Sequence, residues 1–180
     1  MTEIVPPDSW LQRPRRITGD RDPIALFCAV GLSLTMWETI EGGISVAYIG
    51  LVDTEPYDDD RYFKTPSFEA RYKLVKKAID TNINAKDCAG FSALLDLVFK
   101  FSPRRNEIAH GRVFNMGEQG YIIGPNNSLA RNFVNKTATY QYIAADVNFY
   151  AAHFKTLGDH ATEFGNVLAR RRDNSSTASA

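Results

Sequence analysis

Residues 146–172 carry the most regular hydrophobic pattern in the chain. Apolar side chains recur there at alternating steps of three and four, at Val147, Tyr150, Phe154, Leu157, Ala161, Phe164 and Leu168. This spacing lines one face of an α-helix and is typical of a helix that packs in a bundle. Asp146 is suited to cap its N-terminus, and the arginines at 170–172 favour its C-terminus through the helix dipole. Such a helix needs other helices against which to bury its stripe.

A second apolar segment runs from residue 23 to about residue 52, after an N-cap and first-turn proline at Asp22-Pro23. It is long enough to span a bilayer, but Glu38 and Glu41 would each cost about 2.5–3.5 kcal/mol at the bilayer centre. We therefore predict a buried helix and no membrane span. Gly42-Gly43 leaves open whether one helix or two abutting helices form. The predicted core-facing residues are Phe27, Val30, Leu34, Trp37, Ile40, Ile44 and Ala47.

Two more helices are expected in the middle of the chain, after an acidic loop at residues 53–66. Ser67 is a suitable N-cap for the first, which presents an apolar stripe on one side and a cluster of lysines on the other. We expect those lysines to face solvent rather than a ligand. The second helix ends near Phe101. The stripes are Phe68, Tyr72, Val75 and Ile79 in the first helix, and Phe91, Leu94, Leu95, Val98 and Phe101 in the second.

Short β-type runs separated by Gly, Pro and Asn replace the helical pattern between residues 113 and 142. They predict a small hairpin or a three-stranded excursion before the last helix. The predicted fold is therefore mainly α: an antiparallel bundle of four main helices plus one short motif helix, with a small β-hairpin. We expect an N-terminal arm at 1–21, one bundle domain at 22–172 and a flexible tail at 173–180. The basic cluster at 13–16 belongs either to a solvated arm or beside an anion site.

The composition is that of a soluble globular protein, with 44% hydrophobic and 23% charged residues and a formal net charge of zero. Any anion site must therefore be a local patch. Cys28 and Cys88 lie in apolar segments far apart in the sequence, so we predict buried free thiols in a reducing cytosol rather than a disulfide. The N-terminus lacks the pattern of a signal peptide, and we expect a cytoplasmic protein. No Cys or carboxylate pattern accompanies His153 and His160, so we predict no metal site there.

The stretch from Ser102 to Gly111 carries the residues best suited to chemistry. Ser102-Pro103 predicts the start of a short helix, and Gly111 predicts its end through a left-handed turn after His110. Asn106 and His110 are four residues apart and share one helix face, and the long side chain of Arg105 can reach the same groove. An arginine, an amide and a histidine held on one rigid turn can act on a phosphodiester.

The hexapeptide from Arg105 to His110 resembles the motif of HEPN (higher eukaryotes and prokaryotes nucleotide-binding) domains. In that motif, arginine is followed by a polar residue, then by three further residues and then by histidine. The order of elements over about residues 22–170 is also similar to that of small bacterial HEPN-like proteins. Those are α-helical bundles, and many are metal-independent endoribonucleases or toxins. The resemblance implies an RNA substrate, no cofactor and a homodimer in which two motif helices face one cleft.

The resemblance also implies roles for individual residues. His110 would exchange a proton with the 2′-hydroxyl or the leaving oxygen, and Arg105 would stabilise the transition-state phosphate. Asn106 would orient the imidazole or a phosphate oxygen. The positions of the basic residues, apart from the resemblance, predict a substrate-binding rim of Arg104 and Arg112, together with Arg105, Arg131 and Lys136. The product would be a 2′,3′-cyclic phosphate, and a toxin of this kind would be restrained by a nucleotidyltransferase-like antitoxin.

Two other hypotheses stay open from the sequence. In the first, the domain binds RNA or a nucleotide, or serves dimerisation, without cutting. In the second, the motif residues only satisfy backbone groups in a bundle that binds a protein partner. The zero net charge and the absence of an obvious basic face weigh against tight RNA binding.

Overall fold

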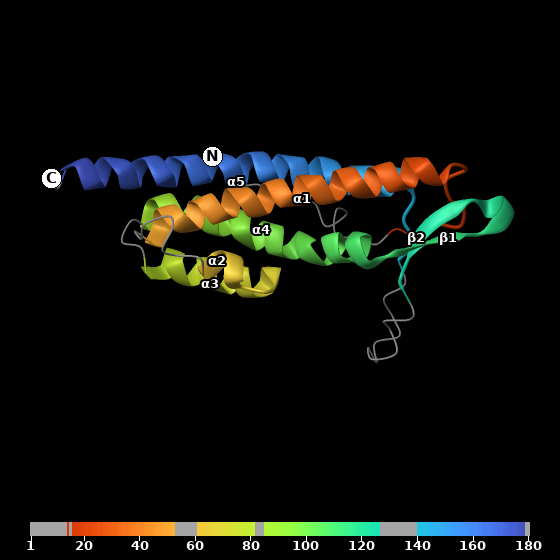
Figure 1. Ribbon diagram of the computed structural model, residues 1–180, viewed down its shortest axis with the longest axis horizontal. Coiled ribbons are helices and arrows are strands. Elements are labelled where there is room, and N and C mark those ends of the chain that lie inside the picture. The colour runs from red at the N-terminus through yellow and green to blue at the C-terminus, as the bar shows by residue number, and fades with distance from the viewer. Residues whose placement is uncertain (1–13, 15, 53–60, 82–84, 127–139, 179–180) are drawn as a thin grey trace. The chain divides into compact units, whose positions relative to one another are not determined.

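The structure is a computed structural model that describes residues 14, 16–52, 61–81, 85–126 and 140–178. The predicted mainly helical fold with a hairpin before the last helix is confirmed (Figure 1). The elements are α1 (Pro23–Val52), α2 (Arg61–Lys64), α3 (Phe68–Thr81), α4 (Ala85–His110), β1 (Arg112–Asn115), a 3₁₀ turn (Gly117–Gln119), β2 (Tyr121–Gly124) and α5 (Ala144–Ala178).

The chain divides into two compact units, and the division falls inside three continuous helices. Among the described residues, the helical unit contains 38–52, 61–81, 85–100 and 155–178. The motif unit contains 14, 16–37, 101–126 and 140–154. Because α1, α4 and α5 each contribute to both units, no loop composition in the sequence marks the division.

α1 is one unbroken helix, so the segment from residue 23 to 52 does not form two abutting helices. Asp22 caps it as predicted, because the Ile24 N–H donates to Asp22 Oδ1 at 2.9 Å. Gly43 does not break the helix and instead allows α5 to approach. A Cβ atom placed on Gly43 would lie 2.6 Å from the backbone carbonyl carbon of Ala161. Gly43 therefore serves close helix packing in the helical unit, whereas Gly42 faces open space.

The first half of α1 is less buried than the sequence predicts. Of the described helices, α1 alone is long and apolar enough to cross a membrane by length and composition. Only 28% of its most apolar 18-residue window is buried. Cys28 is a free thiol but is exposed, so its predicted burial is wrong, whereas Cys88 is both free and buried. Hydrophobic spacing alone cannot tell which of two apolar faces meets the core.

In the helical unit, polar contacts join α3 to α4 on the side that the lysines occupy. The predicted cap at Ser67 is confirmed, with the Ala70 N–H donating to Ser67 Oγ at 3.2 Å. Lys76 is not simply solvated, since its Nζ lies 3.0 Å from Asp96 Oδ1 and 2.6 Å from Ser92 Oγ. Its neighbour Lys73 pairs with Glu69, one turn earlier on the exposed surface of α3.

The core of the motif unit is aromatic and joins its parts of α1, α4 and α5. Trp37 meets the ring of Phe154 edge-on at 5.1 Å between centroids, and Phe101 meets the same ring at 6.2 Å. Tyr142 packs against Tyr150 of α5 at 5.7 Å. These rings are almost completely buried.

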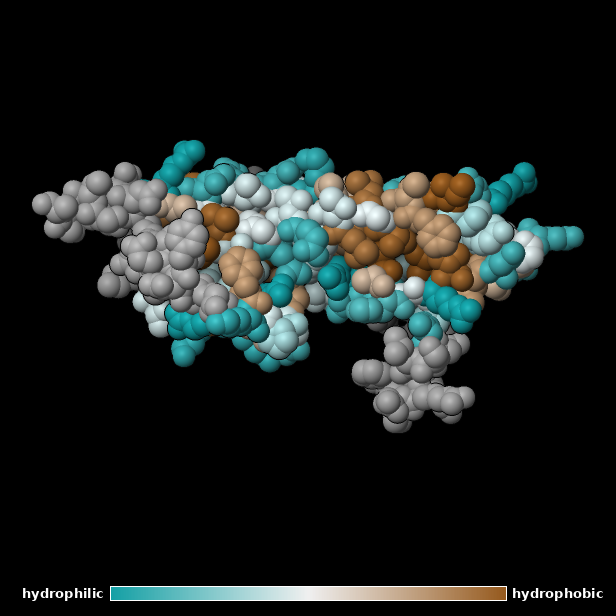
Figure 2. All heavy atoms as spheres, viewed as in Figure 1, coloured by the Kyte–Doolittle hydropathy of each residue, from teal (hydrophilic) through white to brown (hydrophobic). Residues whose placement is uncertain are grey.

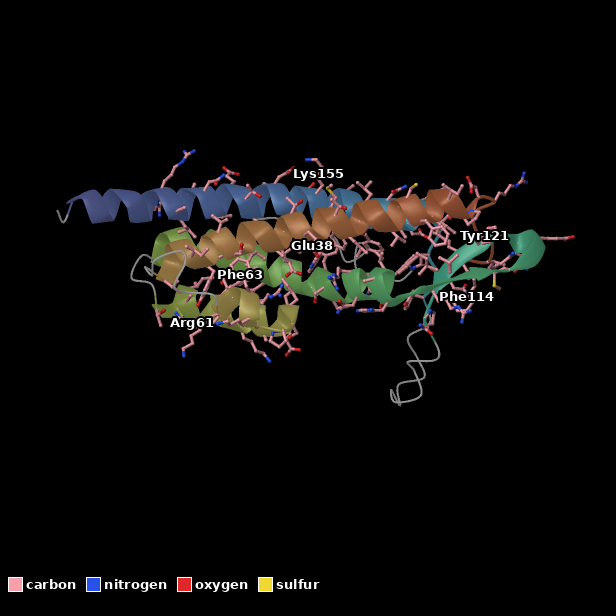
Figure 3. All side chains as sticks on the ribbon, in the orientation of Figure 1. Glu38, Arg61, Phe63, Phe114, Tyr121 and Lys155 are labelled. Atoms are coloured by element: carbon pink, nitrogen blue, oxygen red, sulfur yellow. The ribbon has the colours of Figure 1, made fainter. Side chains whose placement is uncertain are left out.

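The hairpin is two-stranded and antiparallel, with Arg112 opposite Gly124 and Asn115 opposite Tyr121. Its turn requires glycine, since Gly117 and Gly120 both adopt positive φ, at 65° and 89°. Isolated bridges add Asp20 beside Tyr121 and Tyr142 beside Ile123, so flanking segments extend the pairing without forming a third strand. Figure 3 shows Phe114 on β1 and Tyr121 on β2.

The described part of the predicted N-terminal arm is bound to the motif unit. Arg16 forms two hydrogen bonds to Asp146, at 3.0 Å from Nε and 2.5 Å from Nη2. Asp20 Oδ2 accepts the Ala144 N–H at 2.6 Å. Asp146 is the third residue of α5 rather than its N-cap, and it caps from inside by accepting the Ile143 N–H at 3.1 Å. Arg13 and Arg15 lie outside the described residues.

The C-terminal helix is longer than predicted. α5 continues to Ala178, so it includes most of the segment that the sequence analysis expected to be a flexible tail. Its inner side carries the predicted stripe, with Val147, Phe154 and Ala161 among the residues that are fully buried. The regular spacing of three and four was therefore a reliable guide to the buried face of this helix.

Candidate functional site

The motif residues lie on the last two turns of α4, in the motif unit, and not on a separate short helix. α4 runs unbroken from Ala85 through Pro103 to His110, so the predicted helix start at Ser102 is wrong. Proline in a helix interior removes one hydrogen bond and costs about 3 kcal/mol or more. Phe101 before it and Ile108 after it are both buried in the core. Their packing keeps the helix continuous where local propensity favours a break.

Gly111 ends α4 as predicted, but for a different reason. Positive φ angles occur among the described glycines only at Gly117 and Gly120, so the predicted left-handed turn at Gly111 is wrong. A Cβ atom at this position would lie 2.4 Å from Ile123 Cγ2 and 2.6 Å from the Glu107 carbonyl oxygen. Close packing of β2 against the end of the helix therefore requires glycine here.

The outer face of these two turns carries Asn106 and His110, and both side chains are exposed. Arg105 is half-buried, and its Nη1 donates to Asn106 Oδ1 at 3.3 Å. The structure thus brings two of the three predicted groups together and places His110 one turn further along the same face. This face meets water, as proton transfer to a bound ligand requires.

The inner face carries a buried polar cluster that we call the Glu107 cluster, formed by Arg104, Glu107, Tyr140 and Tyr142. Arg104 Nη1 lies 2.6 Å from Glu107 Oε2, and each side chain is only 11% exposed. The Tyr142 hydroxyl donates to the same carboxylate oxygen. The Tyr140 hydroxyl donates to the Glu107 carbonyl oxygen at 3.0 Å. Arg104, predicted for the substrate rim, thus contributes its charge to the interior.

The protonation states of the cluster follow from its burial. Burial alone would lower the pKa of Arg104, but the hydrogen bond and charge of Glu107 raise it above its ordinary value. Burial, and then the hydrogen bond to Glu107, raise the pKa of Tyr142 far above neutrality. Burial also raises the pKa of Tyr150 nearby. The guanidinium of Arg104 therefore stays charged, and the hydroxyls of Tyr142 and Tyr150 keep their protons, across the ordinary pH range.

Of the other candidate cations, Arg112 is the one that the structure describes. Arg112 is exposed on β1, directly after Gly111, and its guanidinium carbon lies 5.8 Å from the centroid of the Phe114 ring. Among the predicted rim residues that the structure describes, Arg112 is exposed, whereas Arg104 and Arg105 are partly buried. Arg131 and Lys136 lie outside the described residues.

The two remaining histidines have surroundings unlike those of His110. His153 is half-buried between the rings of Phe101 and Phe149, and burial lowers its pKa. His160 Nδ1 lies 3.9 Å from Glu163 Oε2, in the helical unit. In the described ranges, no three His, Cys, Asp or Glu side chains are grouped so as to hold a metal ion.

No family model, curated protein or solved structure matches this chain. The resemblance to HEPN domains therefore depends on the residues from Arg105 to His110 and on the order of the elements around them.

Sequence reasoning missed three residues of the inner face, Glu107, Tyr140 and Tyr142. Glu107 stands three residues after Arg104, a spacing that predicts an ion pair on a helix, and this signal was available. Tyr140 and Tyr142 were assigned only to a β-type run, although their alternation places both rings on one side. Their contact with Glu107 spans more than thirty residues. Nothing local predicts that contact.

Proposed function

We propose that this protein is a metal-independent endoribonuclease of the HEPN type. The observation that best supports the proposal is the exposed outer face of α4, where His110 and Asn106 meet solvent and Arg105 is bonded to Asn106. On this proposal Arg105 and His110 are the catalytic residues, and Asn106 and Arg112 contact the substrate.

RNA carries its own nucleophile, so the protein needs to supply proton transfer and charge stabilisation. His110 takes the proton of the 2′-hydroxyl as that oxygen attacks the phosphorus. The bond to the 5′-oxygen breaks, and this oxygen receives a proton as it leaves. Arg105 donates hydrogen bonds to the phosphate oxygens as negative charge builds on them. The products are a 2′,3′-cyclic phosphate and a free 5′-hydroxyl.

The Glu107 cluster supports this proposal by neutralising the one carboxylate in the motif. A free carboxylate next to Arg105 would repel a phosphodiester. Glu107 instead points inward, paired with Arg104 and bonded to Tyr142. The outer face therefore presents a cation, an amide and an imidazole without an opposing negative charge from Glu107.

The second proton transfer is the reason to propose a homodimer. One copy of the motif supplies one exposed histidine, whereas cleavage is fastest when an acid and a base act together. A second copy facing the same cleft would supply the other. We place the activity in the cytoplasm, in a toxin or defence effector whose restraint would fall to a nucleotidyltransferase-like antitoxin.

The alternative is a module that binds RNA or a nucleotide without cutting it. The engagement of Arg104 in the buried cluster leaves fewer cations for a long phosphate chain, so a nucleotide or a short RNA is the ligand that suits this alternative better. On this reading RNA stays intact but raises the thermal stability of the protein, and Arg105→Ala removes the effect.

The decisive experiment incubates the purified protein with a fluorescent RNA in excess EDTA. We expect cleavage that falls about 100-fold or more in His110→Ala and Arg105→Ala, since each removes a group that acts in the transition state. His160→Ala is the matched control and should keep full activity, because His160 lies on α5 in the helical unit. A substrate with a 2′-deoxy linkage should remain intact.

Equal cleavage by all variants would identify a contaminating nuclease and defeat the proposal. Intact RNA with thermal stabilisation that depends on Arg105 would establish the binding module instead.

A further inference from the structure

The first half of α1 exposes an apolar surface that the fold of one chain leaves open to solvent. Ile24, Phe27 and Leu32 are 66%, 58% and 49% exposed, and Cys28 and Gly31 between them are exposed as well. We call these five residues the α1 stripe. In Figure 2 hydrophobic side chains gather over the part of α1 that belongs to the motif unit.

The stripe has the spacing of a helix-packing seam. Its members follow one another at steps of three and one, so at 100° per residue they cover one face of α1. Phe27 and Leu32 lie on either side of a line through Ile24 and Gly31. The opposite face of the same turns is already buried, at Leu26, Ala29 and Ser33. A helix that is apolar on both faces is typically covered on both.

Gly31 has no side chain, so a second helix can approach the α1 stripe closely at this position. A Cβ atom placed there meets no atom within 4 Å, so nothing in the described part of a single chain requires glycine at this position. Farther along the same helix, Gly43 is the point where the backbone of α5 comes close. The hydroxyl of Thr35, one turn beyond, donates to the Gly31 carbonyl oxygen at 2.9 Å and adds no unsatisfied polar group to the surface.

Charge and length decide between the possible occupants. Residues 23–37 contain no charged side chain, so the stripe offers nothing to a charged partner surface. They span about 22 Å as a helix, whereas a bilayer core needs about 30 Å, and Glu38 follows directly. An uncharged surface with a small residue between two large ones is complementary to a copy of itself, as a two-fold symmetric contact requires.

We propose that the α1 stripe is the self-association surface of this protein, with α1 of a second copy packed across Gly31. A contact through one helix pair belongs with the small, transient interfaces, so association is measured up to hundreds of micromolar. The proposal does not depend on ribonuclease activity, because association is measured without RNA.

Sedimentation equilibrium of the full chain and of substituted variants tests the proposal. Wild-type protein should form dimers, and Phe27→Glu with Leu32→Glu should be monomeric. Met116→Glu is the matched control, since Met116 is 44% exposed in the same unit but lies outside the stripe. Far-UV circular dichroism checks that each variant is folded.

Gly31→Leu separates a close helix contact from general stickiness. The leucine has open space in a single chain and adds apolar surface, yet it blocks the approach of a second backbone. We expect it to raise the dissociation constant about tenfold or more. Gly42→Leu, at another open position of α1, should leave the dissociation constant unchanged.

Three results would overturn the proposal. They are a wild-type chain that stays monomeric at hundreds of micromolar, a Gly31→Leu variant that associates more tightly, and a monomeric chain that co-sediments with phosphatidylcholine–phosphatidylglycerol vesicles.

Discussion

The last two turns of α4 have an outer and an inner face that share a backbone and differ in almost everything else. On the outer face, Asn106 and His110 are exposed and free to meet a ligand. On the inner face, Arg104 and Glu107 form a buried ion pair to which Tyr142 donates a hydrogen bond. The comparison teaches that the segment is held in place by one face so that the other is available for chemistry. Substitutions should therefore separate stability from activity along a single helix.

The largest effect is expected from Glu107→Ala on the inner face. The change leaves the buried Arg104 guanidinium without this carboxylate, and breaking a buried pair costs about 3–5 kcal/mol. The free energy of unfolding, measured by guanidinium denaturation, should fall by this amount. His110→Ala on the outer face is the control and should change it by less than about 0.5 kcal/mol. Similar losses in both variants would contradict the division into two faces.

The next largest effect is expected where the inner face ends. Gly111→Ala forces a methyl group against Ile123 and the Glu107 carbonyl oxygen, and overpacking of this kind costs about 1–3 kcal/mol. Gly42→Ala is the matched glycine control, because its position in α1 is open and lies outside the α1 stripe. Replacing glycine inside a helix by alanine there should stabilise the chain by about 0.5–1 kcal/mol. Thermal unfolding of the two variants should shift in opposite directions, and a neutral Gly111→Ala would refute the close contact.

A smaller effect is expected from Tyr142→Phe. It removes one donor to the Glu107 carboxylate and keeps the ring packing, which should cost about 1–2 kcal/mol. Tyr121→Phe provides the comparison, since its hydroxyl only accepts a 3.4 Å bond from Asn115 at the exposed hairpin. Urea denaturation should show the loss in the first variant and almost none in the second. The reverse order would mean that the Glu107 cluster does not hold the helix.

The smallest effect is a pH dependence that extends the comparison to the histidines. Burial lowers the pKa of His153 below its ordinary value of 6.5, so the unfolded chain binds its proton more readily than the folded one. The stability that depends on this group is complete above pH 6.5 and is lost as the pH falls below it. His153→Phe should weaken the decline in unfolding free energy between pH 7.5 and 5.5. His110→Ala should leave that decline in place, and a decline that His153→Phe does not alter would exclude this origin.

Local signals in the sequence predicted where several elements begin and end. Asp22 and Ser67 accept backbone N–H groups at the starts of α1 and α3, as their residue types indicate. The glycines of the hairpin turn adopt positive φ. Each of these depends on contacts within a few residues, which is why sequence could reveal them.

The predictions that were wrong concern burial and packing, which contacts within a few residues do not determine. Pro103 does not begin a helix, because the burial of Phe101 and Ile108 outweighs its local preference for a break. Cys28 is exposed, because a helix that is apolar on both sides does not indicate which side meets the core. Arg104 was assigned to the rim with its neighbours, although its partner Glu107 holds it inside.

The sequence by itself determined the mainly helical fold, the hairpin before the last helix and the residue types that meet on the motif turns, because helical periodicity and turn chemistry act over short distances. Only the tertiary structure decided which motif residues point outward. Contacts of Tyr140 and Tyr142 with Glu107, and of β2 with the end of α4 at Gly111, select one face of α4 for the core. The remaining face, with Asn106 and His110, is left to solvent.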